Sequence, residues 1–197
     1  MTIDVFITLL GFMLVATTTP GPNNVMLFAS GVNFGLRATI PHIVGIANGM
    51  GLLLLCVGFG LGQVLETFPL VFTAIKVFGA LYMLYLAWRI ANSGPLHVGE
   101  GNARPMNYFE AALFQWVNPK SWLVAVVVSS TYTAQDNYYA SLMVIIAMFA
   151  VGNIPFISTW AIFGTALKRF LCDPKKLRVF NIVMAIALVI SLWPMLR

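Results

Sequence analysis

Long apolar runs follow one another along almost the whole chain, and short polar connections separate them. Each run holds about 20 residues, the length that an α-helix needs to cross a hydrocarbon core of roughly 30 Å. The pattern therefore predicts an all-α integral membrane protein with six transmembrane helices and no soluble domain. We expect these helices near Val5–Phe28, Ile43–Leu65, Val71–Ile90, Phe109–Thr131, Tyr139–Leu167 and Val179–Leu196.

Polar, helix-breaking residues interrupt the first and the fourth of these runs. The first interruption is Thr19-Pro20-Gly21-Pro22-Asn23-Asn24 and the second is Asn118-Pro119-Lys120. Proline removes a backbone donor and clashes with the preceding turn, so neither run can form one unbroken helix. Backbone groups that are freed at bilayer depth must be buried in protein or line a wet cavity. Paired interruptions of this kind point to a substrate site built from discontinuous helices, as in secondary transporters.

The two interruptions also predict an internal repeat. Pro20 and Pro119 lie 99 positions apart, and each half of the chain supplies three of the predicted spans. An odd number of spans per half places the second half upside down in the membrane relative to the first, which gives an inverted repeat. We expect one transmembrane transporter domain over residues 1–197, with helices 1 and 4 broken and with repeat halves at 1–92 and 105–197.

The composition agrees with burial in lipid. Apolar residues make up 60% of the chain and charged residues only 9%, whereas roughly a quarter of the residues in a soluble domain are charged; the mean hydropathy is +0.89. The net charge of +5 does not indicate nucleic acid, because the basic residues gather in the connections after the first, third and fifth spans. By the positive-inside rule these connections are cytoplasmic and both termini face outward. We also expect the first span to be retained, because no Lys or Arg precedes Arg37, as a cleaved signal peptide would require.

Three segments of the chain together resemble the LysE/RhtB family of amino-acid exporters. They are Thr19-Pro20-Gly21-Pro22-Asn23, the run Lys76-x-x-Gly79-Ala80-x-Tyr82-x-x-Tyr85-Leu86-Ala87-Trp88, and the stretch from Phe109 through Asn118-Pro119-Lys120. Within the family, Leu86-Ala87-Trp88-Arg89-Ile90-Ala91 and Gln115-Trp116-Val117-Asn118 look most similar to the cysteine and O-acetylserine exporters. The resemblance implies proton-driven efflux of amino acids or their derivatives, by alternating access, across a bacterial inner membrane.

An amino-acid substrate carries a carboxylate and an ammonium group, and protein groups must replace the water around both. A broken helix offers amides of positive partial charge at one end and free carbonyls at the other. We therefore expect the two interruptions to face each other near the bilayer midplane and to bind the zwitterion. The candidate substrate-binding residues are Pro20, Gly21, Pro22, Asn23, Asn24, Asn48, Gln115, Asn118, Pro119, Lys120 and Asn153.

Several of these residues also fit simpler interpretations. Lys120 is either the counter-charge of the substrate carboxylate or a proton carrier, or else it extends to an interface or donates to the carbonyls freed by Pro119. Asn48 and Asn153 are equally typical of hydrogen bonds between membrane helices. Gln115 lies nearly on the same helical face as Asn118 because three residues separate them.

No carboxylate lies deep inside a predicted span, so proton coupling needs another group. The candidates are Lys76, Lys120 and His42, with a carboxylate at a span end or protonation of the substrate itself as further options. Lys76 lies just inside the start of its span, near the outer face, and an interfacial anchor or a local cap also explains it. A histidine is the side chain that titrates nearest neutral pH, but a histidine with no such function is also common at a helix end.

The main alternative to a carrier is a membrane protein without transport function, such as a thiol-redox or reductant-relay component. Such a protein needs cysteines that can meet in its core. Cys56 lies in a span and Cys172 lies in a connection, so this pair does not meet that requirement. An intramembrane enzyme needs a nucleophile with a base, or a cluster of metal ligands, and neither pattern is present in the sequence. We expect no enzymatic activity, no cofactor and no metal. The expected partners are an amino-acid substrate and the lipid bilayer, and a homodimer is left open.

Overall fold

The computed structural model describes residues 2–61, 67, 69–93, 104–134, 136–171 and 173–193, and these form helices and connections without a strand. The first half contains α1 (Ile3–Thr18), α2 (Pro22–Phe34), α3 (Leu36–Cys56), the π-helical segment η1 (Val57–Leu61) and α5 (Pro69–Ala91). The second half contains α6 (Tyr108–Val117), α7 (Pro119–Thr131), α8 (Tyr138–Ala147), the π-helical segment η2 (Met148–Gly152), α9 (Ile154–Lys168) and α10 (Pro174–Ile190).

Two pairs of helices bend sharply at the predicted interruptions. The axes of α1 and α2 meet at 60°, and those of α6 and α7 meet at 72°. Steric clash with a following proline favours extended backbone, and Thr19, Gly21 and Asn118, which each precede a proline, are all extended. Pro22 and Pro119 then occupy the first turn of α2 and of α7, where the missing N–H of a proline costs nothing. The predicted breaks in the first and fourth runs are confirmed.

Several helical segments are long and apolar enough to cross a membrane. In the described part these are Leu36–Leu61, Thr73–Ala91 and Tyr138–Lys168, and the number rises from three to five if each bent pair counts as one span. The sixth predicted span, Val179–Leu196, overlaps α10, which has 17 residues and ends before the predicted boundary. An all-helical protein with several membrane-spanning helices is therefore confirmed, and the six-span inverted repeat stays a prediction.

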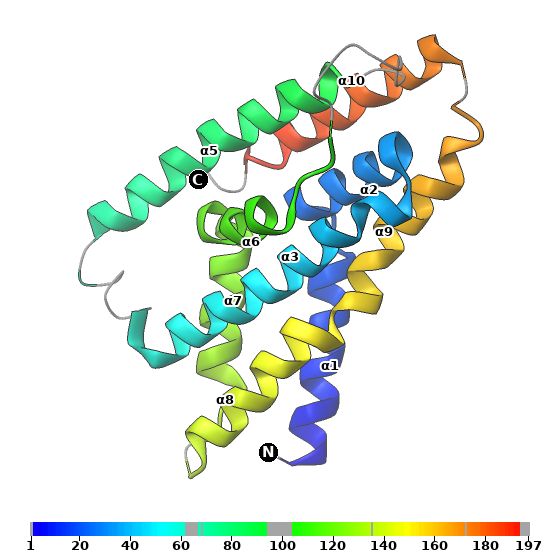
Figure 1. Cartoon of the computed structure of the whole chain (residues 1–197). Helices are drawn as coiled ribbons and strands as arrows, with labels where there is room; N and C mark the ends of the chain where they lie inside the picture. Colours follow the sequence, from blue (N-terminus) through cyan, green and yellow to red (C-terminus); the bar gives the residue numbers. More distant parts are fainter. Residues whose placement is uncertain are drawn as a thin grey trace.

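The broken helices pack against the long helices of the opposite half. In Figure 1, α2 lies along α9, α3 lies along α6, and α5 pairs with α10 along one side of the molecule. Glycines allow the first two of these approaches. A Cβ on Gly31 would collide with the backbone of Ala161 in α9, and a Cβ on Gly45 would collide with the backbone of Tyr108 in α6. Small residues at such positions are typical of close helix packing in membranes.

Large apolar side chains cover the outer faces of the helices. Phe78 of α5, Phe109 of α6 and Ile190 of α10 are 66%, 72% and 65% exposed. Contiguous apolar surface of this extent is rare on soluble monomers, whereas lipid tails cover it without cost. A set of polar side chains that includes Asn24, Gln115 and Asn118 is, in contrast, buried between the helices.

Candidate functional site

The two helix breaks lie against each other, although they are far apart in the sequence. The Nζ of Lys120, at the start of α7, donates to the backbone carbonyl oxygen of Thr19, at the end of α1, over 2.8 Å. A Cβ on Gly21 would lie only 3.2 Å from the same Nζ. The cation of the second break is therefore held against the backbone of the first.

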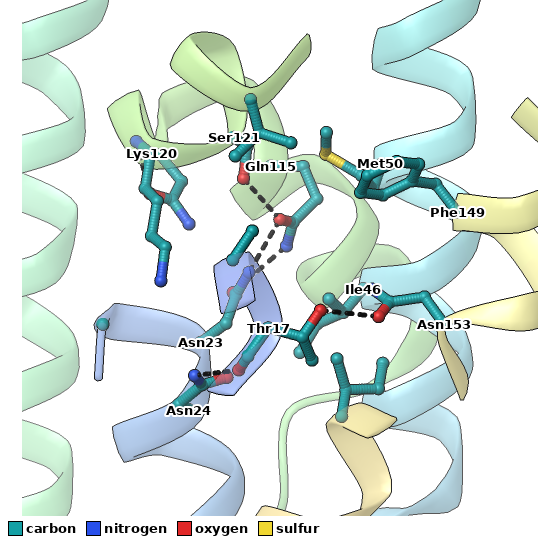
Figure 2. Close-up of a pocket in the computed structure, with 15 residues that line it drawn as sticks. Thr17, Asn23, Asn24, Ile46, Met50, Gln115, Lys120, Ser121, Phe149 and Asn153 are labelled. Atoms are coloured by element: carbon teal, nitrogen blue, oxygen red, sulfur yellow. Dashed lines mark hydrogen bonds between the residues drawn. The ribbon is translucent and has the colours of Figure 1, made fainter. Parts of the chain in front are cut away.

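A pair of side-chain amides also connects the two breaks. Asn23 Nδ2 donates to Gln115 Oε1 over 2.9 Å, and Gln115 Nε2 donates back to Asn23 Oδ1 over 3.2 Å. Ser121 Oγ donates to the same Gln115 Oε1 over 2.8 Å. Figure 2 shows these three side chains meeting between α2, α6 and α7. The network joins the start of α2 to both arms of the second broken helix.

Asparagines satisfy the backbone groups that the breaks expose. Asn24 Nδ2 donates to the carbonyl oxygens of Thr17 and Thr19 over 2.6 and 2.8 Å, which caps the end of α1. Asn118 Oδ1 accepts from the backbone N–H of Lys120 over 3.1 Å, which caps the start of α7. Free backbone groups at a helix end need such partners where water is scarce.

These groups border a small cavity, which we call the break cavity. Its volume is about 60 Å³, which leaves room for a few water molecules and none for a whole amino acid. Most of the polar lining groups come from the two broken helices, whereas α3, η2 and α9 contribute apolar side chains together with Asn153. The lining residues are Ala16, Thr17, Gly21, Asn23, Asn24, Ile46, Met50, Gln115, Asn118, Lys120, Ser121, Val124, Phe149, Asn153 and Ile157.

Most of the candidate residues from the sequence come together at this cavity. The candidates that line it are Gly21, Asn23, Asn24, Gln115, Asn118, Lys120 and Asn153. Asn153 reaches it from the start of α9 and accepts a hydrogen bond of 2.7 Å from Thr17 Oγ1. Pro20, Pro22 and Pro119 shape the breaks without lining the cavity.

The remaining candidates lie elsewhere. Asn48 Nδ2 donates to the hydroxyl of Tyr108 over 3.4 Å and does not line the break cavity. The reason is helical geometry, since Ile46 and Met50 line the cavity and a residue two positions from each points to the other side of α3. Lys76 belongs to α5, and its side chain lies outside the described part. His42 borders a different cavity.

That second cavity, which we call the wide cavity, lies between α2, α3, α5 and the start of α6. Its volume is about 510 Å³. Arg89, Arg104 and Glu110 border it together with His42. Arg104 and Glu110 form an ion pair with two side-chain hydrogen bonds. Hydrogen bonding to Glu110, followed by its charge, raises the pKa of the Arg104 guanidinium above its ordinary value.

Sequence reasoning missed part of the lining of the break cavity. Thr17 and Ser121 stand within a few residues of the prolines, and this position is the signal that could have identified them. His42, Ile46 and Met50 recur every four residues along α3, which places them on one face of the helix. That face borders both cavities, because His42 lines the wide cavity while Ile46 and Met50 line the break cavity.

The cysteines and metal-binding residue types form no second site in the described part of the chain. No group of three or more His, Cys, Asp or Glu side chains in that part could hold a metal ion. Cys56 is free and half-buried at the end of α3, and it lines neither cavity. Cys172 lies outside the described residues, so its relation to Cys56 stays a matter for the sequence alone.

Broken helices whose ends meet at a polar cavity, inside an all-helical membrane bundle, define the architecture of a membrane transport protein. Residues 14–191 match the family described as LysE type translocator, and the chain belongs to that family. The family resemblance seen in the sequence is thereby confirmed. Membership in a family of translocators also agrees with the expectation of a protein that is not an enzyme.

The chain is similar to proteins named cysteine/O-acetylserine efflux protein in several bacteria. The protein of this name from Escherichia coli (strain K12) is 29% identical over 184 residues, which cover 90% of this chain and 90% of the relative. The one from Klebsiella pneumoniae subsp. pneumoniae is 31% identical over 168 residues, which cover 81% of this chain and 82% of the relative. No solved structure matches the chain.

Proposed function

We propose that this protein exports amino acids or their derivatives from the cytoplasm, with cysteine and O-acetylserine as the first candidates. One observation carries the proposal: the two helix breaks of a LysE type translocator meet at a polar cavity, where Lys120 of one break contacts Thr19 of the other. The names of the similar proteins supply the substrate candidates.

The break cavity offers complementary groups for a zwitterion. The N-terminal end of α2 carries positive partial charge, and the ammonium group of Lys120 lies beside it at Gly21. Together they suit the substrate carboxylate. The carbonyls of Thr17 and Thr19 at the end of α1 now accept from Asn24, and that of Thr19 also accepts from Lys120. Both carbonyls suit the substrate ammonium. Asn23 and Gln115 add side-chain donors and acceptors.

Binding requires the cavity to enlarge, because about 60 Å³ is too small for an amino acid. Alternating access supplies this change if the half-helices swing about the breaks, opening the site first to one side of the membrane and then to the other. The hydrogen bonds from Asn23, Gln115 and Lys120 join the two breaks. These bonds would exchange for contacts with the substrate as the site opens.

The membrane arrangement of this proposal has six spans, with α10 as the sixth, and both termini on the periplasmic face. Each half then consists of a broken helix, a helix with a π-helical segment and a third helix. This shared order supports the inverted repeat. The connection that contains Arg104 would face the cytoplasm by the positive-inside rule, as would the wide cavity beside it.

Coupling to protons is the most detailed part of the proposal. The residues that line the break cavity include one charged side chain, Lys120, so this residue is the first candidate for a group that binds a proton in one state and releases it in another. His42 is the second, since it lies on the face of α3 that runs between the cavities. Lys76 stays a candidate from the sequence.

Uptake into inside-out membrane vesicles tests the proposal directly. Labelled cysteine and O-acetylserine, with lysine and leucine for comparison, are offered with and without an imposed proton gradient. Gradient-dependent uptake of cysteine or O-acetylserine, lost in Asn118→Ala, is the expected result. Uptake of none of the four, by vesicles shown to hold folded protein, would overturn the proposed substrates. Uptake that does not depend on the gradient would support the proposed export and contradict its coupling to protons.

A further inference from the structure

Residues of α2, α3 and α6 line both the break cavity and the wide cavity. Gln115 of α6 lines the first and Glu110 of α6 lines the second, and their separation of five positions corresponds to about 7.5 Å along a helix axis. The same succession occurs on α3 with Ile46 and His42. The wide cavity is therefore placed directly beyond the break cavity, at the end where the Arg104 connection enters the bundle.

His42 is buried in the wall of the wide cavity without a hydrogen-bond partner. Its side chain is 1% exposed, and neither ring nitrogen has a partner among the described residues. A neutral imidazole has one donor and one acceptor, and buried polar groups in proteins are nearly always paired. A polar ligand in the cavity would supply the missing partner.

Arg89 borders the same cavity with donors to spare. Its Nη2 donates to the backbone carbonyl oxygen of Arg104 over 3.2 Å, which uses one of the five N–H groups of a guanidinium. In the described part of the chain the one ion pair joins Arg104 to Glu110, so no carboxylate there pairs with Arg89. A guanidinium fits a carboxylate well because two parallel N–H donors match its two oxygens.

Glu110 supplies the opposite charge. Its carboxylate accepts from Arg104 and from the backbone N–H of Asn107. The Arg104 side chain is 53% exposed and that of Glu110 is 26% exposed, so Arg104 can turn toward solvent while Glu110 stays at the cavity. An arriving ammonium group can therefore replace Arg104 as the partner of Glu110.

From these contacts we propose that the wide cavity is a second binding site, which receives an α-amino-acid zwitterion before it reaches the break cavity. The substrate carboxylate binds Arg89, its ammonium group binds Glu110 in place of Arg104, and His42 hydrogen-bonds to one of its polar groups. The volume of about 510 Å³ lies in the range of roughly 300–1,000 Å³ that is typical of small-molecule sites. This inference rests on the proposed export of amino acids.

Histidine resonances provide a test that does not depend on transport. The chain has two histidines, so His97→Gln leaves His42 as the only one. The protein with ¹⁵N-labelled histidine is placed in lipid bilayers and titrated with O-acetylserine, observed by solid-state NMR. The ring nitrogen signals of His42 should shift to saturation in this background, and Arg89→Gln should weaken the apparent affinity at least tenfold. Arg37→Gln, which removes an exposed arginine outside both cavities, is the matched control.

A carboxylate without an amino group separates the zwitterion from simple anions. Acetoxypropionate, which is O-acetylserine without its amino group, should move the His42 signals only at much higher concentration. Equal shifts with both ligands would overturn the role of Glu110 and the zwitterion assignment. No shift with O-acetylserine, from protein that transports it normally, would overturn the second site while leaving the proposed export intact.

Transport kinetics provide a second test that distinguishes the second binding site from the proposed export function. In inside-out vesicles, Arg89→Gln and Glu110→Gln should each raise the KM for O-acetylserine at least tenfold while changing the maximal rate less. The glutamine at position 110 retains an oxygen that can accept from Asn107. An unchanged KM in both variants would contradict the second site. A wild-type protein that transports neither O-acetylserine nor cysteine would contradict the proposed function, and the NMR titration would still report on the wide cavity.

Discussion

Lys120 and Thr19 join the two helix breaks of this protein through a hydrogen bond of 2.8 Å from Nζ to the backbone carbonyl oxygen. Donation to the carbonyls freed by its own neighbour, Pro119, is one of the interpretations of Lys120 that the sequence leaves open. The structure instead shows a contact with the other break, which lies 101 positions away. This contact makes Lys120 a connection between the two broken helices and also places its charge beside the N-terminal end of α2.

Substitution of Lys120 should separate the charge from the hydrogen bond. Lys120→Met removes both and should lower uptake of O-acetylserine into inside-out vesicles by about tenfold or more, since loss of one charged hydrogen bond costs roughly 1.5–3 kcal/mol. Lys120→Arg keeps the charge and should retain much of the activity. Lys120→Gln can still donate to Thr19 but carries no charge, so we expect it to resemble Lys120→Met.

Lys175→Met provides the control for these variants, because Lys175 is exposed in the first turn of α10 and lines neither cavity. If Lys120→Gln transports as well as the native protein, Lys120 serves as a connection between the breaks and the substrate carboxylate has another partner.

The reciprocal hydrogen bonds of Asn23 and Gln115 should couple these residues energetically. Truncating either one leaves the other without its partner at a buried or half-buried position, and each single change to alanine should cost about 1–3 kcal/mol of stability. The double variant should cost less than the sum, with a coupling of roughly 0.5–3 kcal/mol. Unfolding of purified protein in detergent, followed by tryptophan fluorescence, measures all three. Costs that add without coupling would mean that the pair does not form in the folded protein.

Local chemistry explains why the breaks could be predicted. Proline constrains its own φ angle and the residue before it, so Pro20, Pro22 and Pro119 indicate the bends from neighbouring residues alone. Asparagine at a helix start is a preferred cap, and Asn118 has this role. The same locality explains why most of the predicted polar residues line one cavity, because they are the residues closest to the breaks.

Contacts between distant segments could not be predicted in the same way. Arg89 and Arg104 are among the basic residues that indicate the topology, and Glu110 is one of the carboxylates at span ends. Their meeting at the wide cavity depends on how α5 and α6 pack. Asn48 shows the limit for a residue within a helix. It resembles Asn153 in residue type and in its place within a span. However, Asn48 lies on the face of α3 that points to Tyr108 and away from the break cavity.

The orientation in the membrane gives a prediction that single fusions can check. If the basic connections are cytoplasmic, alkaline phosphatase fused after residue 197 should be active because it reaches the periplasm. The same enzyme fused after Ser93 should be inactive, whereas a green fluorescent protein at that site should fluoresce. Activities in the reverse order would place Arg104 and the wide cavity on the periplasmic face and would remove the wide cavity from the cytoplasmic entrance.

Glycine substitutions should show that the α2–α9 contact depends on the absence of side chains. Gly31→Ala places a methyl group against the backbone of Ala161, which cannot rotate away as a side chain would, so we expect a loss of about 1–3 kcal/mol in stability. Gly11→Ala is the matched control, since Gly11 lies inside α1 with no atom within 4 Å of its added Cβ. There the better helix former should stabilise the protein by up to about 1 kcal/mol. Thermal unfolding midpoints of the two purified variants should therefore move in opposite directions. Equal midpoints would mean that α2 and α9 lie farther apart in the membrane than the close approach at Gly31 requires. A looser contact of this kind should also alter the rate at which the half-helices rearrange during transport.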